Sequence, residues 1–298
     1  MKIDRRRFIG QAVGFAAAGA LFNSLPSAFA SPIGLPIGIQ LYTVGDFLQK
    51  DAAATVKRIA QIGYKEVETA GFGSAGSAAA LRKLLDENGL KCPSAHLNFD
   101  LKNLNKAFDD AHALGCKYAT ASVPRMMIAP PIDMSPGADR SKVMQQFQRL
   151  MSSPFTGDEI KKLVEVINQV GAAAKKEGLI FGAHNHGFEF GLVDGKPALY
   201  SMIEQTDKNN VVFELDCGWT EVSGFHPVEI IKAYPGRVRM LHIKDFLPID
   251  KNATGAAARP KGSEIGQGFI DYKKMFEGLK GRKIEHIFVE QEGPFSRM

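Results

Sequence analysis

The sequence predicts a (β/α)8 barrel, in which eight parallel strands form a closed core inside a ring of helices. From Pro36 onward, short apolar runs alternate with amphipathic segments, as they do in repeated βα units. The apolar runs number eight, the number of strands in such a barrel. The chain has 298 residues, 45% of them hydrophobic, which is enough for one barrel of about 250 residues. A doubly wound open sheet is the alternative class.

The expected strands are short apolar runs bounded by turn-forming or polar residues, a pattern consistent with strands buried on both faces. They are expected at Ile37–Tyr42, Glu66–Thr69, Cys92–Leu97, Tyr118–Val123, Ile180–His186, Val211–Asp216, Val238–Lys244 and His286–Glu290. Helices are expected between them at Ala52–Ile62, Ser77–Asn88, Leu101–Leu114, Asp158–Glu177, Pro197–Gln205, Pro227–Ala233 and Tyr272–Leu279. Several of these segments stop at a glycine, such as Gly89, Gly115 and Gly178, which favours the end of a helix.

Two connections are long, and both follow strands on the side where barrel active sites form. Residues 124–157 follow the fourth strand and contain a short helical pattern at Lys142–Met151. Residues 246–268 follow the seventh strand. We expect both to form a lid or a substrate wall. Only residues 291–298 follow the eighth strand, so we expect the chain to be truncated and to lack the last helix of the barrel.

The first thirty residues have the layout of a signal peptide, with basic, apolar and cleavage regions in that order. The run Arg5-Arg6-Arg7-Phe8-Ile9 resembles a twin-arginine export signal, and Ala28-Phe29-Ala30 supplies a cleavage site. We therefore predict a signal peptide at 1–30, a catalytic barrel at 31–298 and a periplasmic protein that meets the membrane only during export. An uncleaved anchor is the alternative, although the apolar run is short for a span of about 20 residues.

Charge and cysteine content narrow the function further. The segment 1–30 holds four basic residues and one acid, so its removal lowers the net charge from +5 to about +2. The pI near 9.0 is thus weak evidence for nucleic-acid binding. The three cysteines, Cys92, Cys116 and Cys217, form no CxxC pair and are expected to be reduced and structural.

Four of the later strands end in side chains that can bind a metal ion. These are His184, Asp216, His242 and Glu290. A second polar residue lies two positions from each of them, on the same face of its strand: His186, Glu214, Lys244 and Glu292. Burying so many polar groups costs free energy unless they are paired or bind something. Two imidazoles and two carboxylates suit one divalent ion, Mn²⁺, Zn²⁺, Co²⁺ or Mg²⁺.

Polar residues also end the first four strands, and they would line the other half of the same mouth. They are Gln40, Tyr42, Glu68, His96, Asn98, Thr120 and Ser122. We take Gln40, Glu68 and His96 as candidate substrate-binding residues, with ordinary surface exposure as the alternative. Trp219 is a candidate apolar wall for a sugar ring.

A GxGxxG match at residues 71–76 is interpreted as a tight βα loop. It follows the second strand instead of the first. It also lacks the acid that a dinucleotide site places about 20 residues further on. A nicotinamide site is therefore not predicted.

The chain resembles the xylose-isomerase-like TIM barrels, specifically the sugar phosphate isomerase/epimerase group. The matching segments extend from Ile37 to Glu292 and read IGIQLYTV, YKEVETAGF, SAHLNF, AHNHGFEF, FELDCGWTEVSGFHPVEII, RVRMLHIKDF, EIGQGFIDYKKMF and FVEQE. The resemblance implies one divalent metal at the ends of strands five to eight, held here by His184, Asp216, His242 and Glu290. The chain departs from the group at His184, where many members have a glutamate that also transfers a proton.

The resulting functional hypothesis is a metal-dependent isomerase or epimerase of a sugar or keto-sugar, working through an enediolate. Glu290, Glu292 and His186 are the candidate bases, and Lys244 is a candidate for stabilising oxyanion charge, with a salt bridge to Asp216 or Glu214 as its alternative role.

Three alternatives stay open at this point. The first is a lyase or dehydratase acting on keto-sugars or 3-keto-glycosides, since the enolate step is shared. The second is a non-catalytic periplasmic sugar-binding module. The third is a nucleic-acid enzyme, which export and the low charge disfavour. A homo-oligomer is compatible with all of them.

Overall fold

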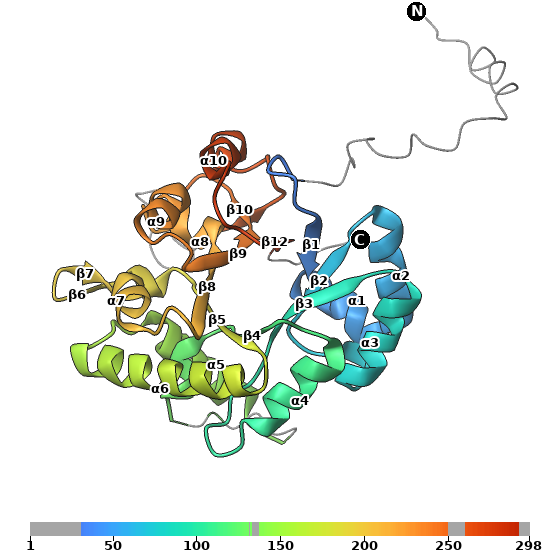
Figure 1. The fold of residues 1–298 in the computed structure, drawn as a ribbon, viewed down its shortest axis with the longest axis horizontal. Helices are drawn as coiled ribbons and strands as arrows, with labels where there is room; N and C mark the ends of the chain where they lie inside the picture. The colour runs from blue at the N-terminus through green and yellow to red at the C-terminus, as the bar shows by residue number, and fades with distance from the viewer. Residues whose placement is uncertain (1–30, 131, 133–136, 250–259, 292–298) are drawn as a thin grey trace, which may run out of the picture.

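A computed structural model describes residues 31–130, 132, 137–249 and 260–291. The predicted signal peptide at 1–30 and the predicted base Glu292 lie outside the described residues. In the described part, eight parallel strands form a closed barrel in the order β1-β12-β9-β8-β5-β4-β3-β2. Helices surround this barrel (Figure 1). The predicted (β/α)8 class is therefore confirmed.

The barrel strands correspond to the eight apolar runs. Their bounds are β1 Ile37–Gln40, β2 Glu66–Thr69, β3 Lys91–His96, β4 Tyr118–Ala121, β5 Ile180–His184, β8 Val211–Asp216, β9 Val238–Ile243 and β12 His286–Val289. Gly38 of β1 pairs with Glu66 on one side and with Phe288 on the other, which closes the barrel. Two small antiparallel hairpins were not predicted. They pair β6 Leu192–Val193 with β7 Lys196–Pro197, and β10 Asp245–Phe246 with β11 Gly262–Ser263.

The helices are α1 Gly45–Lys50, α2 Ala52–Ile62, α3 Ala78–Glu87, α4 Asn105–Leu114, α5 Arg140–Ser152, α6 Gly157–Lys176, α7 Ala198–Gln205, α8 Cys217–Val222, α9 Pro227–Ala233 and α10 Tyr272–Leu279. Their ends have local causes. Asp51 caps α2 and Thr156 forms a capping box with Glu159 at the start of α6. Gly63 and Gly115 end α2 and α4 with positive φ. Within the described ranges, no helix has the length and apolar character needed to cross a membrane.

Several predicted strand ends were wrong by a few residues. The first strand stops at Gln40, before Tyr42, because the Gln40 side chain accepts a hydrogen bond from the Tyr42 N–H and begins a 3-10 turn. Strand β5 ends at His184 and strand β12 ends at Val289, so His186 and Glu290 lie just beyond their strands. The carboxyl ends of the strands are thus irregular, as is common where polar side chains bond to nearby backbone.

An apolar layer fills the barrel beneath the polar strand ends. Tyr118, Val212, Met240 and Phe288 form this layer, each from a different strand. The Phe288 ring lies against Gly38, where an added Cβ would come within 2.6 Å of Phe288 Cδ1. Glycine is therefore required at this close approach. A second, larger core lies between the strands and the helices, so the polar residues above the layer stand on a rigid support.

Candidate metal centre

The four predicted metal ligands lie together at the carboxyl ends of the strands. His184 ends β5, Asp216 ends β8, His242 lies near the end of β9 and Glu290 directly follows β12. Each is buried, and one candidate ligand atom from each lies within 4.8 Å of those of the other three. Strands β5, β8, β9 and β12 are neighbours in the closed sheet, so their polar ends meet at one mouth of the barrel.

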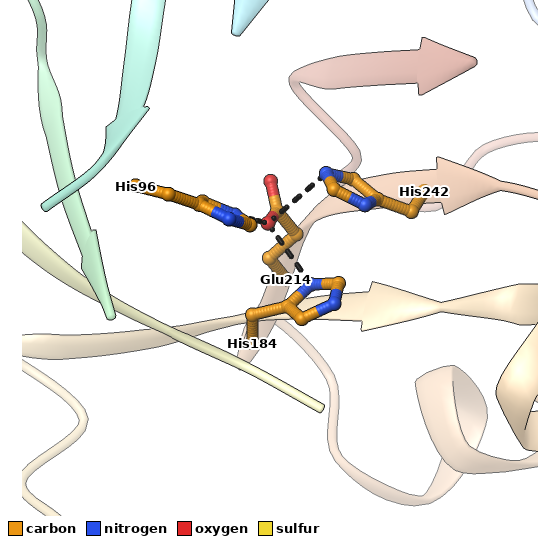
Figure 2. A group of neighbouring side chains, drawn as sticks. All are labelled: His96, His184, Glu214 and His242. Carbon is orange, nitrogen blue, oxygen red and sulfur yellow. Dashed lines mark hydrogen bonds and ion pairs between the residues drawn. The ribbon is translucent and has the colours of Figure 1, made fainter. Parts of the chain in front are cut away.

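A second group of possible ligands shares both histidines with the first (Figure 2). Its centre is the Glu214 carboxylate, which three imidazoles surround. Glu214 Oε2 lies 2.7 Å from His96 Nε2, 3.1 Å from His184 Nδ1 and 3.2 Å from His242 Nε2. The sequence indicated Glu214 only as a polar neighbour of Asp216 on the same strand face. Its position between three histidines depends on side chains from four strands.

His242 is held from both sides of its ring. Its Nδ1 lies 2.7 Å from Glu290 Oε2, and its Nε2 lies 2.6 Å from Glu68 Oε2. Gln40 Nε2 in turn donates to the same oxygen of Glu68 at 2.8 Å. Gln40 and Glu68, predicted to bind substrate, are therefore engaged in positioning His242 in this structure. Their contact with a substrate stays a prediction.

Burial sets the protonation of His184, which ends β5, and of His186, two residues further on. Burial, together with the nearby His242, lowers the pKa of His184 to about 3. Burial and His184 also hold the pKa of His186 well below its ordinary value. Both imidazoles are thus neutral at physiological pH. A neutral imidazole is the form that binds a metal ion.

The pKa values of the other ionisable residues of the centre depend on neighbouring charges as well as on burial. Burial raises the pKa of Asp216 to about 6, although Lys244 opposes the shift. Burial alone would raise the pKa of Glu290, but Lys244 and His242 hold it well below its ordinary value. Burial alone would lower the pKa of His242, but Glu214 and Glu68 raise it well above its ordinary value. His242 would therefore have to release this proton in order to bind a metal ion. The carboxylate of Glu290 is therefore ionised and available as a ligand or base.

Lys244 lies between the two carboxylates of the predicted ligand set. Its Nζ is 3.2 Å from Asp216 Oδ2 and 3.2 Å from Glu290 Oε2. The salt bridge to Asp216, given as its alternative role, is present. Lys244 Nζ also lies 5.6 Å from the centre of the Trp219 ring, which places the predicted apolar wall at the same mouth.

Buried polar atoms without hydrogen-bond partners test whether the residues fit a metal ion. Among the described residues they include Glu214 Oε1, Asp216 Oδ2, His186 Nδ1 and Trp219 Nε1. Asp216 Oδ2 has an ion-pair contact with Lys244 but no hydrogen bond. A buried carboxylate oxygen left in this state is costly unless it has another partner. A mixed set of imidazoles and carboxylates that includes atoms without hydrogen-bond partners fits a divalent cation.

Glu189 is a buried acid that the sequence reasoning missed. It lies in the 3-10 turn Phe188–Phe190 after β5, and its Oε2 accepts a hydrogen bond of 2.8 Å from the His186 N–H. Burial raises the pKa of Glu189 to about 8, and its Oε1 has no hydrogen-bond partner. In the sequence, its position in the segment HGFEF, five residues after His184, was the signal that could have indicated this acid. Glu189 therefore orients the backbone that carries His186.

Residues 56–294 match the family described as the xylose isomerase-like TIM barrel. The chain belongs to this family. The match covers the strands that supply His96, His184, Asp216, His242 and Glu290. The resemblance noted from the segments AHNHGFEF, ELDCGW and LHIKDF is confirmed at the level of the family.

Named relatives of this xylose isomerase-like barrel are enzymes of more than one reaction class. An inosose dehydratase from Clostridium perfringens is 30% identical over 147 residues, which are 45% of this chain and 48% of that protein. The chain thus spans about half the length of that relative. A sugar phosphate isomerase/epimerase from Parabacteroides distasonis has a TM-score of 0.65 and 25% identity over 88% of this chain and 92% of its own.

A third similarity shows the fold alone. The D-allulose 3-epimerase from Methylomonas sp., solved in complex with D-allulose, has a TM-score of 0.59 at 17% identity. The similarity covers 89% of this chain and 86% of the epimerase. The xylose isomerase-like TIM barrel family is thus shown for this chain, and the reaction is a matter for proposal.

Proposed function

We propose that this protein is a divalent-metal-dependent isomerase or epimerase that removes a proton from the carbon beside the carbonyl of a keto-sugar. The observation that carries the proposal is the convergence of His184, Asp216, His242 and Glu290 beside Lys244. Its substrate would be a small sugar or a sugar derivative, and nucleic acid is not proposed as a partner.

The ligands would be His184, Asp216, His242 and Glu290. A divalent ion bound there supplies Lewis-acid polarisation of the substrate carbonyl. Lys244 contributes a fixed positive charge, which stabilises negative charge that develops on a substrate oxygen. Glu68 and Glu214 hold the imidazole of His242 in place from the opposite side.

Proton transfer needs a base at the same mouth. The described candidates are Glu290, which is ionised, and His186, which is neutral and whose Nδ1 has no hydrogen-bond partner. Either group can accept the substrate proton and return it. Return of the proton to the neighbouring carbon gives isomerisation. Delivery of a proton to the opposite face of the same carbon, by a second group on that face, gives epimerisation. Glu292, the third predicted base, lies outside the described residues.

Dehydration or glycoside elimination is the second candidate reaction, and a specific observation favours it. The resemblance to the sugar phosphate isomerase/epimerase group implies that His184 stands where many members have a proton-transferring glutamate, and this chain has no carboxylate at that position. Loss of a β-hydroxyl or alkoxy group from the enediolate needs one proton removed from carbon and one proton donated to the leaving oxygen, but no proton returned to carbon. The inosose dehydratase similarity supports the same possibility.

The test is hydrogen exchange in D₂O with keto-sugars and 3-keto-glycosides as probes. Protein reconstituted with Mn²⁺, Co²⁺, Zn²⁺ or Mg²⁺ is expected to incorporate deuterium beside the carbonyl, as measured by NMR. Chelation is expected to lower this rate by about 10²-fold or more. Epimer formation supports the isomerase reading, and an unsaturated product supports the lyase reading. Sugar binding without exchange under every metal condition would contradict catalysis and favour a binding module.

We also propose that the protein is exported to the periplasm by the twin-arginine signal at its N-terminus. Replacing Arg5 and Arg6 by lysine keeps the positive charge but removes the arginine pair that the export machinery reads. The periplasmic fraction is expected to lose the protein, as measured by immunoblotting of cell fractions. The matched variant Arg7→Lys is expected to be exported normally. Equal export of all three proteins would refute the proposal.

A further inference from the structure

A cavity lies at the ends of β3 and β4, next to the strand β5 that supplies His184. Its volume is about 460 Å³, within the range of small-molecule sites. It is lined by residues at and after the ends of these two strands and by Phe147 of α5. The apolar side chains that define it are Leu97, Phe99, Val123, Met126, Met127 and Phe147.

This apolar cavity shares lining residues with a smaller cavity that His96 also lines. The smaller cavity, of about 340 Å³, is lined by His96 together with Leu97, Asn98 and Ser122. The last three residues also line the apolar cavity. His96 Nε2 is 2.7 Å from Glu214 Oε2 in the cluster of histidines. A ligand that contacted His96 and also occupied the apolar cavity would extend from His96 toward Phe147 of α5.

The described lining of the apolar cavity offers no positively charged partner for a phosphate group. Among the described residues that line it, none is Lys, Arg or His. Its one charged residue, Asp100, accepts a hydrogen bond from the Lys102 N–H. Lys106, which lines the smaller cavity, is paired with Asp110 at 3.0 Å. A second sugar ring would also find few partners for its hydroxyl groups.

Methionine and phenylalanine side chains suit a flat apolar group. Met126 and Met127 are flexible and polarisable, and Phe147 offers an aromatic face. Phe147 is also only partly buried, on a helix that has no fully buried residue. The cavity therefore has an apolar lining that an apolar group of a ligand would cover.

We propose that this cavity binds an apolar, aromatic aglycone, so that the substrates are keto-glycosides of aromatic alcohols instead of sugar phosphates. The proposal rests on the function proposed for the metal centre, because the sugar part of the same molecule occupies that centre. The aglycone contacts involve none of the predicted metal ligands. The preference for an aromatic group is therefore independent of the metal.

Binding by calorimetry tests the proposal with three probes: phenyl β-D-glucoside, methyl β-D-glucoside and methyl β-D-glucoside 6-phosphate. The phenyl compound is expected to bind about tenfold or more tightly than the methyl compound, since part of its ring leaves water. The preference is expected to persist after chelation. Deuterium exchange with a methyl 3-keto-glucoside tests the metal centre separately, so the two proposals can fail independently.

Two variants of α5 provide the matched comparison. Phe147→Ala is expected to reduce the phenyl preference to about twofold or less and to leave methyl glucoside binding unchanged. Met144→Ala, at a residue of the same helix that is 56% exposed and does not line the cavity, is expected to retain the preference. Equal affinity for phenyl and methyl probes, no binding of the phenyl probe, tighter binding of the phosphate, or equal effects of the two variants would each overturn the proposal.

Discussion

Asp216→Asn is expected to remove the bound metal and to lower turnover by more than about 10²-fold. Loss of a ligand should exceed the 10- to 100-fold typical of losing only a ligand's hydrogen-bond partner. Asp216 Oδ1 accepts the Trp219 N–H at 2.8 Å and caps α8, and asparagine can keep this cap. The substitution removes the charge and the Oδ2 acceptor beside Lys244. Metal content by mass spectrometry and turnover in the exchange assay measure the result.

The matched control for this change is Asp51→Asn. Asp51 Oδ1 caps α2 by accepting the Ala54 N–H at 2.9 Å, at an exposed position. The same chemical change is expected there to leave metal content and turnover as they are. Lys244 keeps its contact with Glu290 in Asp216→Asn, so we expect that variant to remain folded by circular dichroism. Unchanged metal content in folded Asp216→Asn would show that Asp216 is not a ligand.

Phe288→Ala is expected to lower the free energy of unfolding by about 3 to 5 kcal/mol. Phe288 is fully buried inside the barrel, and its ring centre lies 6.1 Å from that of His242 in an edge-to-face arrangement. Alanine would leave a cavity directly against Gly38, and a rigid barrel cannot collapse to fill it. Urea unfolding measures this loss: the midpoint urea concentration is expected to fall, while the slope of the unfolding free energy against urea concentration stays unchanged.

Phe269→Ala is the control for this second prediction. Phe269 is 39% exposed, and the hydrogen bond from its N–H to the Phe246 carbonyl survives truncation to alanine. Its effect is expected to stay below about 1 kcal/mol. If both variants lost the same stability, the apolar layer beneath His242 would not be the support that we infer.

The elements that could be predicted are those with a local signal. The strands β5, β8, β9 and β12 are mainly apolar runs that a polar residue ends or directly follows. The helices α2, α6 and α10 have regular apolar spacing with a capping residue. The hairpin β10–β11 carried no such signal because its strands have two residues each. The Asp245 carboxylate supports it by accepting the N–H groups of Gly266 and Gly268, more than 20 residues away.

The residue types of the site, and the strand face on which each one lies, were determined by the sequence alone. Alternation along a strand places Glu214 with Asp216 and His242 with Lys244 whatever the fold. Which side chains touch was decided only by the tertiary structure. His96 meets Glu214 across 118 residues, and Glu68 meets His242 across 174. Those contacts depend on barrel closure and strand register, and a one-residue shift would turn every such side chain to the other face.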